Sequence, residues 1–320
     1  MPNGVLILAE AVDGDLAPVS LELVGAAQRL GAGPVNAMLL GSGVESVASK
    51  VLGVEKTYVV DDAALAQYTT DAYVQAAEAV VKQADPAIIL MGQTNIGRDL
   101  APALAARLGT AAAMDTIALE MNDGKLHTTR PAYGGNARAV NSFATEPAIA
   151  TVRPKAQDPV QGGSPGAVEK VAFSPSNVRA KVVARKVATT EGVRLEDADV
   201  VVSGGRGLGG PEGFQGIEEL AKLLGGAVGA SRAVADLGWR PVAEQVGLTG
   251  KVVSPTLYIA VAISGASQHM AGCSGSKNIV AINKDPDANI FKAARFGIVG
   301  DYKQVLPAFI EAVKKVKAEG

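Results

Sequence analysis

Short apolar runs that alternate with longer helix-like stretches constrain the fold of this chain more than any other feature. In the first part of the chain such runs lie at 5–9, 35–40, 56–60 and 87–91. Runs of this length without polar alternation are typical of strands that are buried on both faces of a sheet. The stretches between them, such as 16–30 and 71–82, have helical periodicity. Strands that alternate with helices form βαβ units, so the pattern predicts an α/β fold with a parallel sheet.

The region from residue 116 to residue 173 has a different pattern, in which strand candidates follow one another without helices between them. These candidates lie at 116–121, 125–131 and 148–152. Sequential strands with short connections usually pair antiparallel. We therefore expect an antiparallel extension of the first domain in this region.

Alternation of strands and helices begins again at residue 199 and continues to the last helix. The predicted strands are 199–203, 227–230, 257–263 and 279–282, and the predicted helices are 213–224 and 302–317. A chain of 320 residues is longer than one typical core requires. We therefore expect two α/β domains, formed by residues 1–189 and 190–320.

The composition argues against several classes of protein. The formal net charge is −2, from 30 basic and 32 acidic residues, whereas a nucleic-acid-binding surface normally carries a basic excess. No apolar run reaches the roughly 18 residues of a transmembrane helix, so we expect no membrane insertion. The first run is followed at once by Glu10 and Asp13, unlike a signal peptide, and the single cysteine, Cys273, excludes an internal disulfide. These features predict a cytoplasmic protein.

The most concentrated polar chemistry follows two predicted strands, 257–263 and 279–282. The residues that carry it are Ser264, Gly265, Gln268 and His269 after the first strand and Asn283 and Asp285 after the second. Hydroxyl, amide, imidazole and glycine backbone groups at two strand ends make a site for a phosphorylated cofactor. Neither His127 nor His269 has cysteine, histidine or carboxylate neighbours at the spacing of metal ligands. The sequence also contains no recognisable Ser/His/Asp arrangement. We therefore predict no metal site and no catalytic residue.

A glycine-rich loop supports an alternative function. The segment from Gly205 to Gly210 has the spacing G-x-G-x-x-G and lies between a predicted strand and a predicted helix, as in dinucleotide-binding proteins. That fingerprint requires an acidic residue roughly 20 positions later to bind the ribose. Here the next strand leads into Ser231 and Arg232, and no carboxylate follows before Asp236. Because an arginine suits a 2′-phosphate, an NADP-dependent oxidoreductase remains an alternative.

Three further loops are candidates for ligand contact. Ser231 and Arg232 form a pair that suits an anion, since guanidinium matches phosphate or an electron-rich ring. The turn from Gln245 to Gly250 presents Thr249. The segment 92–102 follows a buried strand and opens a helix, so it suits either an anion or an ordinary helix cap with Asp99 at the helix start.

Five motifs in the second half occur in one characteristic order. They are Ser203-Gly-Gly-Arg-Gly207, Ala227-Val-Gly-Ala-Ser-Arg232, Gln245-Val-Gly-Leu-Thr-Gly250, the block from Tyr258 to Gly272, and Ala281-Ile-Asn-Lys-Asp-Pro286. In this order they resemble the alpha subunit of electron transfer flavoproteins. The resemblance is dense over 199–302 and looser in the first half, where it includes 97–102 and 130–135. The chain departs from the family at Leu248, often glutamine, and at Ala262 and Ser267, usually glycine and a branched apolar residue.

The resemblance implies one FAD, bound mainly by a C-terminal doubly wound, Rossmann-like domain. The positions that match the family's cofactor contacts are Arg206, Ser231, Arg232, Gln245, Gly247, Thr249, Gly250, Ser264, Gly265, Gln268, His269, Asn283 and Asp301. By analogy, Thr249 donates to flavin N5, Arg232 lies over the ring system and His269 approaches the pyrimidine carbonyl. Ser264 and Gln268 bind the pyrophosphate. Asn283 and Asp301 bind the adenosine end.

The resemblance also implies an electron carrier rather than an enzyme with its own substrate. A carrier needs no catalytic groups because the flavin supplies the redox chemistry. In this family the alpha subunit pairs with a beta subunit that often carries AMP, and residues 1–189 are expected to contact that partner. The expected electron donors are flavin dehydrogenases, such as the acyl-CoA dehydrogenases of fatty acid β-oxidation. The expected acceptor is a membrane quinone reductase.

Overall fold

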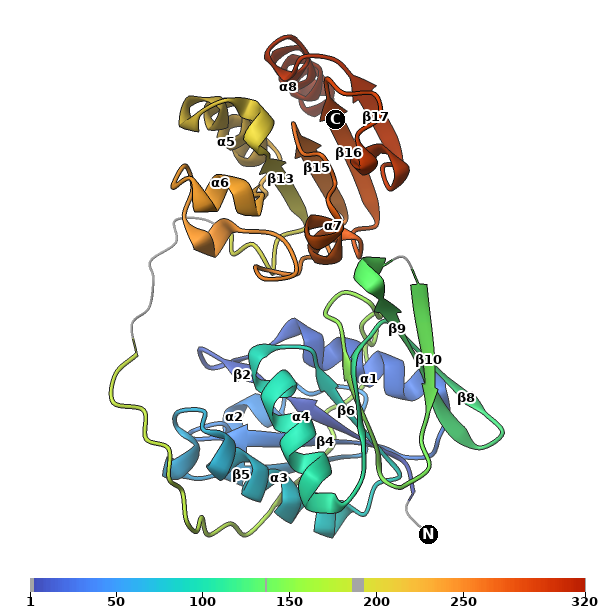
Figure 1. The fold of residues 1–320 in the computed structure, drawn as a ribbon. Coiled ribbons are helices and arrows are strands. Elements are labelled where there is room, and N and C mark those ends of the chain that lie inside the picture. The colour runs from blue at the N-terminus through green and yellow to red at the C-terminus, as the bar shows by residue number, and fades with distance from the viewer. Residues whose placement is uncertain (1–2, 136, 186–192, 320) are drawn as a thin grey trace. The chain divides into compact units, whose positions relative to one another are not determined.

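The computed structural model describes residues 3–135, 137–185 and 193–319, which form two compact units (Figure 1). One unit comprises Met1–Ala132 and Arg138–Lys186, and the other comprises Tyr133–Ala137 and Val187–Gly320. The predicted domain boundary between residues 189 and 190 lies outside the described residues.

Seven parallel strands form the main sheet of the first unit, in the order β12-β5-β4-β1-β6-β11-β7. Their bounds are β1 Val5–Ala9, β4 Val35–Gly41, β5 Lys56–Asp61, β6 Ile88–Gly92, β7 Ala112–Thr116, β11 Ala148–Val152 and β12 Ala167–Lys170. The four strands predicted from continuous apolar runs are confirmed as β1, β4, β5 and β6. A small hairpin of β2, Ala11–Val12, and β3, Asp15–Leu16, follows β1.

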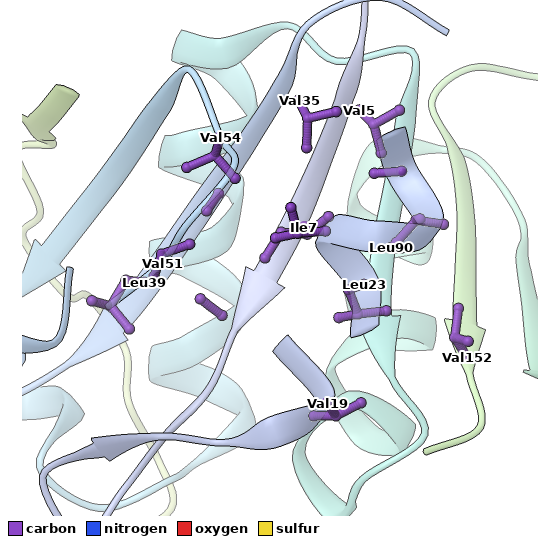
Figure 2. Close-up of a cluster of buried hydrophobic side chains, with 14 of the residues drawn as sticks. Val5, Ile7, Val19, Leu23, Val35, Leu39, Val51, Val54, Leu90 and Val152 are labelled. Atoms are coloured by element: carbon purple, nitrogen blue, oxygen red, sulfur yellow. The ribbon is translucent and has the colours of Figure 1, made fainter. Parts of the chain in front are cut away.

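Helices cover both faces of this sheet because successive strand residues point to opposite sides. In β1, Ile7 packs with α1 (Pro18–Leu30) and α2 (Glu45–Ala48), and Leu8 packs with α3 (Thr70–Ala84) and α4 (Asn95–Leu108). Figure 2 shows the first of these two cores, with Ile7, Leu23 and Leu90 at its centre, all 0% exposed. Burial on both faces explains why the strand runs carry no polar alternation.

The prediction that 148–152 belongs to an antiparallel extension is wrong. This segment is β11, which pairs parallel with both β6 and β7 inside the main sheet. All five β11 residues are buried, so the strand needs a covered position on both faces. The separate three-stranded sheet contains β8 (Ala118–Asn122), β9 (Lys125–Ala132) and β10 (Ala137–Ser142), and β8 pairs antiparallel with β9. The predicted strand 116–121 spans the break between β7 and β8.

Five parallel strands form the sheet of the second unit, in the order β14-β13-β15-β16-β17. Their bounds are β13 Val200–Gly204, β14 Ala227–Ala230, β15 Leu257–Val261, β16 Asn278–Asn283 and β17 Phe296–Val299. Only β17 lacked a sequence prediction. In chain order the strands read 2-1-3-4-5, so the order reverses between β13 and β15. Ligands of such sheets bind at the carboxyl ends of the strands beside this switch point.

Helices lie on both faces of the second sheet, as expected for a doubly wound fold. The helices α5 (Phe214–Leu223), α6 (Arg232–Asp236) and α8 (Tyr302–Glu319) contribute to one core. The helix α7 (Ser267–Cys273) contributes Cys273 to the core on the other face. No helix in the described parts of the two units is long and apolar enough to cross a membrane.

Candidate functional site

A cavity of about 620 Å³ lies at the carboxyl ends of β13, β14, β15 and β16, beside the switch point of the second sheet. Ten of the thirteen predicted site residues line it. They are Arg206, Ser231, Arg232, Gln245, Gly247, Thr249, Ser264, Gln268, His269 and Asn283. Because carboxyl ends of parallel strands share one edge of the sheet, residues far apart in the sequence meet here.

Three predicted residues do not line the cavity. Gly250 closes the 245–250 turn, where a Cβ would lie 2.3 Å from the Gln245 carbonyl oxygen. Gly265 has a φ of +80°, and a Cβ there would lie 2.3 Å from the Ile290 backbone nitrogen. These two glycines shape the backbone that presents their neighbours. Asp301 instead precedes α8, and its Oδ1 accepts a hydrogen bond of 2.9 Å from the Lys303 backbone nitrogen.

Backbone contacts hold the 245–250 turn against α7. The Leu248 nitrogen donates to the Gln268 carbonyl at 2.7 Å. Gly272 allows the turn to approach, because a Cβ there would lie 2.3 Å from the Gly247 nitrogen. Within the turn, the Gln245 amide donates to Oγ1 of Thr249 at 3.1 Å. The hydroxyl hydrogen of Thr249 is therefore left to donate elsewhere, because its oxygen is the acceptor of this bond.

His269 is buried at the cavity wall. Its Nε2 lies 2.9 Å from the Tyr258 hydroxyl, and its Nδ1 forms no hydrogen bond of regular geometry with the described residues. Burial lowers the pKa of the imidazole to about 4, so the ring is neutral near pH 7. A buried polar atom without a partner points to a group supplied by a ligand.

The charged side chains of the cavity favour an anion. Arg232 Nε lies 3.3 Å from Oδ2 of Asp236, and both side chains are more than half exposed. The Arg206 side chain forms no ion pair or hydrogen bond with the residues that the structure describes. Two guanidinium groups at one cavity match a phosphate or an electron-rich ring. Asp285, which also lines the cavity, accepts from the Asp287 backbone nitrogen at 3.0 Å.

Asn283 ties the ends of two strands together. Its Nδ2 donates to the Ile263 carbonyl at 2.8 Å, and its Oδ1 accepts from the Asp285 nitrogen at 3.0 Å. These bonds position the β16 end beside the β15 end. They leave one amide hydrogen and one oxygen lone pair for a ligand.

The glycine-rich loop does not have the geometry of a dinucleotide fingerprint. In that motif the helix that binds the pyrophosphate starts directly after the strand turn. Here two 3₁₀ turns, Arg206–Leu208 and Pro211–Gly213, separate β13 from α5. Gly205 is required instead for packing, because a Cβ would lie 2.1 Å from the Ala262 carbonyl oxygen. The loop therefore presents Arg206 to the cavity rather than a helix N-terminus.

The loop after β6 in the first unit is an ordinary helix cap. Thr94 Oγ1 accepts from the Gly97 nitrogen at 3.1 Å and donates to Oε1 of Glu10 at 2.8 Å. The cap is thus Thr94, and Asp99, expected at the helix start, instead accepts from the Tyr68 hydroxyl at 2.8 Å. Burial raises the pKa of Glu10 to about 7. A carboxyl group in this position disfavours an anion.

Sequence reasoning missed several residues of the site. Asp236, Leu248 and Ala262 line the cavity but were not predicted to contact a ligand. Their nearness to predicted residues in the sequence was the available signal. Tyr258 lies behind the cavity wall; it opens the motif block from Tyr258 to Gly272, but its position within an apolar strand run gave no sign of a role at the site. In the described part of the chain, no group of three or more His, Cys, Asp or Glu side chains is placed to hold a metal ion.

Two protein-family models match the two halves of the chain. The electron transfer flavoprotein domain matches residues 5–176, and the electron transfer flavoprotein FAD-binding domain matches residues 194–274. The second match covers β13, β14, β15 and α7, which carry most of the cavity.

Curated proteins similar to this chain match it over nearly its whole length. It is 45% identical to the electron transfer flavoprotein subunit alpha of Thermoanaerobacterium thermosaccharolyticum, with 98% of each chain covered. It is 42% identical to the protein of the same name from Bacillus subtilis, with 99% of each chain covered. It is 35% identical to the LctC subunit of the lactate dehydrogenase (NAD(+),ferredoxin) of Acetobacterium woodii, covering 98% of this chain and 77% of that protein.

Proposed function

The chain belongs to the electron transfer flavoprotein alpha-subunit family, whose members are FAD-binding electron carriers, and we propose that it carries electrons from flavin dehydrogenases to a membrane quinone reductase. Acyl-CoA dehydrogenases of fatty acid β-oxidation are the proposed donors. The alpha-subunit family implies pairing with a beta subunit. We propose that residues 1–189 contact this partner and that residues 190–320 bind the FAD.

The observation that carries the proposal is the cavity at the switch point of the second sheet. It gathers ten of the thirteen residues expected to contact FAD, and its volume of about 620 Å³ is in the range of cofactor sites. The unpartnered Nδ1 of His269 and the two arginines supply the polar groups that such a ligand needs. The residues present therefore fit FAD.

When bound, FAD supplies the redox chemistry by taking up and releasing electrons. The residues of the chain bind, orient and tune it. Arg232 and Arg206 offer positive charge where negative charge is to be bound. Thr249, whose oxygen is engaged by Gln245, keeps its hydrogen for the ligand. His269 offers a neutral imidazole, and Ser264 with Gln268 is proposed to hold the pyrophosphate. Asn283 and Asp301 are proposed to hold the adenosine end.

Co-expression of the full chain with the beta subunit of the same organism tests the proposal. The purified heterodimer is expected to show visible flavin absorption and to contain FAD in the alpha subunit. An acyl-CoA dehydrogenase with its substrate is expected to reduce this FAD. Gln268→Ala is expected to weaken FAD binding, whereas Gln215→Ala, on the exposed face of α5, is a matched control that leaves it unchanged. A heterodimer without FAD, or one that binds NADP instead, would refute the proposal.

A second candidate function follows from the similarity to LctC. That protein is a subunit of a lactate dehydrogenase (NAD(+),ferredoxin), and 35% identity extends over 98% of the present chain. We infer that a place in an electron-bifurcating complex is the alternative for this chain. The two functions differ in the partner subunit, which would carry AMP in a simple carrier and a second FAD in a bifurcating complex. Counting the flavins per heterodimer distinguishes the two functions, because one flavin indicates a simple carrier and two flavins indicate a bifurcating complex.

A further inference from the structure

Tyr258 lies behind the cavity wall and contacts His269 from the core. It is the second residue of β15, is 0% exposed and packs in the core between the sheet and α7. Its hydroxyl lies 2.9 Å from Nε2 of His269, and the two rings are tilted by 57°. The strand β15 thus places a hydroxyl next to Nε2 on the core side of the imidazole, while His269 itself lines the cavity.

The groups around this contact are uncharged near neutral pH. Cys273, one turn after His269 on α7, lies beside the phenol, and burial raises the pKa of its thiol to about 12. Burial also raises the pKa of Tyr258 well above its ordinary value and lowers that of His269 to about 4. A neutral imidazole carries one hydrogen, on either Nδ1 or Nε2. Because Nε2 faces the Tyr258 hydroxyl, the position of this hydrogen decides whether Nδ1 donates a hydrogen bond to a ligand or accepts one from it.

The neighbours of the ring favour a hydrogen on Nδ1. Burial lowers the pKa of His269, and the nearby Val246 backbone carbonyl partly offsets this shift because it favours a hydrogen on the imidazole. Because Nε2 faces the Tyr258 hydroxyl, we assign this influence to Nδ1. The contact does not amount to a hydrogen bond of regular geometry, and Nδ1 has no other partner in the described residues. The Nδ1 hydrogen is therefore available to a better-aligned acceptor.

We propose that Tyr258 is a positioning residue for cofactor binding: its hydroxyl donates to Nε2 of His269 and so holds the imidazole as an Nδ1–H donor toward the cavity. The acceptor is an uncharged carbonyl oxygen of the ligand, a group that the flavin ring carries. This inference rests on the proposed FAD site. It assigns the orientation of the donor to a residue that does not itself line the cavity.

The position of the hydrogen can be read by ¹⁵N NMR of the imidazole nitrogens. The chain contains only two histidines, so histidine-labelled protein gives two ring systems, and His127→Gln assigns them. In the wild-type protein we expect a pyrrole-type Nδ1 and a pyridine-type Nε2 for His269. Tyr258→Phe keeps the ring and removes the hydroxyl, and is expected to populate the Nε2–H form. Cys273→Ala removes a polar neighbour of the phenol other than His269 and is expected to leave the tautomer unchanged, as is Ser203→Ala, which removes another.

The FAD-bound heterodimer supplies an independent measurement. Tyr258→Phe is expected to raise the FAD dissociation constant roughly three- to tenfold, the effect of one misdirected hydrogen bond. In a His269→Ala background the same change is expected to have no further effect, as a double-mutant cycle requires for residues that act through one another. An equal loss in both backgrounds would overturn the proposal.

The remaining outcomes are also decisive. A wild-type His269 with its hydrogen on Nε2 would overturn the proposal, even if Tyr258→Phe failed to fold. A Tyr258→Phe protein that keeps the Nδ1–H form would do the same. Absence of FAD from the wild-type heterodimer would instead refute the proposed function, and the NMR comparison would still decide whether Tyr258 sets the tautomer of His269.

Discussion

In the short helix α6, Nε of Arg232 lies 3.3 Å from Oδ2 of Asp236, one turn further along the same helix. Both side chains are more than 60% exposed, so solvent screens the pair and the contact adds little to stability. The Arg232 side chain can therefore leave the carboxylate of Asp236 and pair with a ligand instead. The pair places a positive and a negative charge on the same edge of the cavity.

We expect Arg232→Ala to lower the reduction potential of bound FAD, because reduction adds negative charge that a nearby cation stabilises. At a separation of about 4 Å the effect is about 1 kcal/mol in a solvent-exposed environment. Arg232→Lys is expected to keep part of it, since the charge remains and the planar contact is lost. Asp236→Asn is the matched control and should shift the potential upward. Redox titration of the heterodimers measures all three, and unchanged potentials with FAD still bound would remove this role from Arg232.

Asp301 has a structural role that must be separated from ligand binding. Its side chain caps the start of α8, and asparagine serves as a cap as well as aspartate. Asp301→Asn is therefore expected to leave the free energy of unfolding unchanged and to weaken FAD binding by about 1–3 kcal/mol. Asp301→Ala should lower both the free energy of unfolding and the affinity for FAD. Denaturant unfolding and FAD titration of the two variants provide the measurements, and full affinity in Asp301→Asn would leave only the helix cap.

Glu10 is expected to make the first unit less stable as the pH rises. Its folded pKa of about 7 lies above the ordinary value of 4.5, so the folded state binds the proton more tightly than the unfolded state. The contribution of Glu10 is fully present below about pH 4.5 and is lost as the pH rises through about 7. Glu10→Gln should remove this dependence and stabilise the unit at pH 8, by an amount on the order of 2–3 kcal/mol.

Urea unfolding of the Glu10→Gln protein at pH 5 and pH 8 checks this expectation. Exposed Glu55→Gln serves as the control for the removal of one carboxylate. Glu22 is also buried and has a raised pKa, so the wild-type protein retains some dependence from that residue. The informative quantity is therefore the difference in the free energy of unfolding between the wild type and Glu10→Gln. If this difference were the same at pH 5 and pH 8, it would contradict the pKa assignment.

Gly265 is expected to be intolerant of alanine for two reasons. Its φ is +80°, and a Cβ would lie 2.3 Å from the Ile290 nitrogen. Gly238 has a similar φ of +71° but no atom within 4 Å of a Cβ, so Gly238→Ala measures the backbone strain alone. We expect Gly265→Ala to destabilise the protein by about 1–3 kcal/mol more than Gly238→Ala, as in other overpacked sites. Equal effects on unfolding would show that the Ile290 backbone yields easily.

The parts of the fold that sequence reasoning predicted correctly have a local cause. The strands β1, β4, β5 and β6 are continuous apolar runs, because helices bury both of their faces. The strand β11 has the same character, yet it follows the antiparallel pair β8 and β9 in the chain, and this proximity in the sequence led to the wrong assignment. Its partners β6 and β7 are chosen by burial in the sheet, which no local pattern encodes.

The sequence by itself determined the alternating architecture and the family, and the resemblance to that family identified ten of the residues that line the cavity. Several of these follow strands of the parallel sheet, whose carboxyl ends share one edge. Tertiary structure decided which of the expected residues shape the site rather than line it, as for Gly250 and Gly265. It also decided the contact of Tyr258 with His269, eleven positions apart on a strand and a helix. Contacts of this kind depend on how α7 packs against the sheet, and packing is set by the whole core at once rather than by the periodicity of any segment.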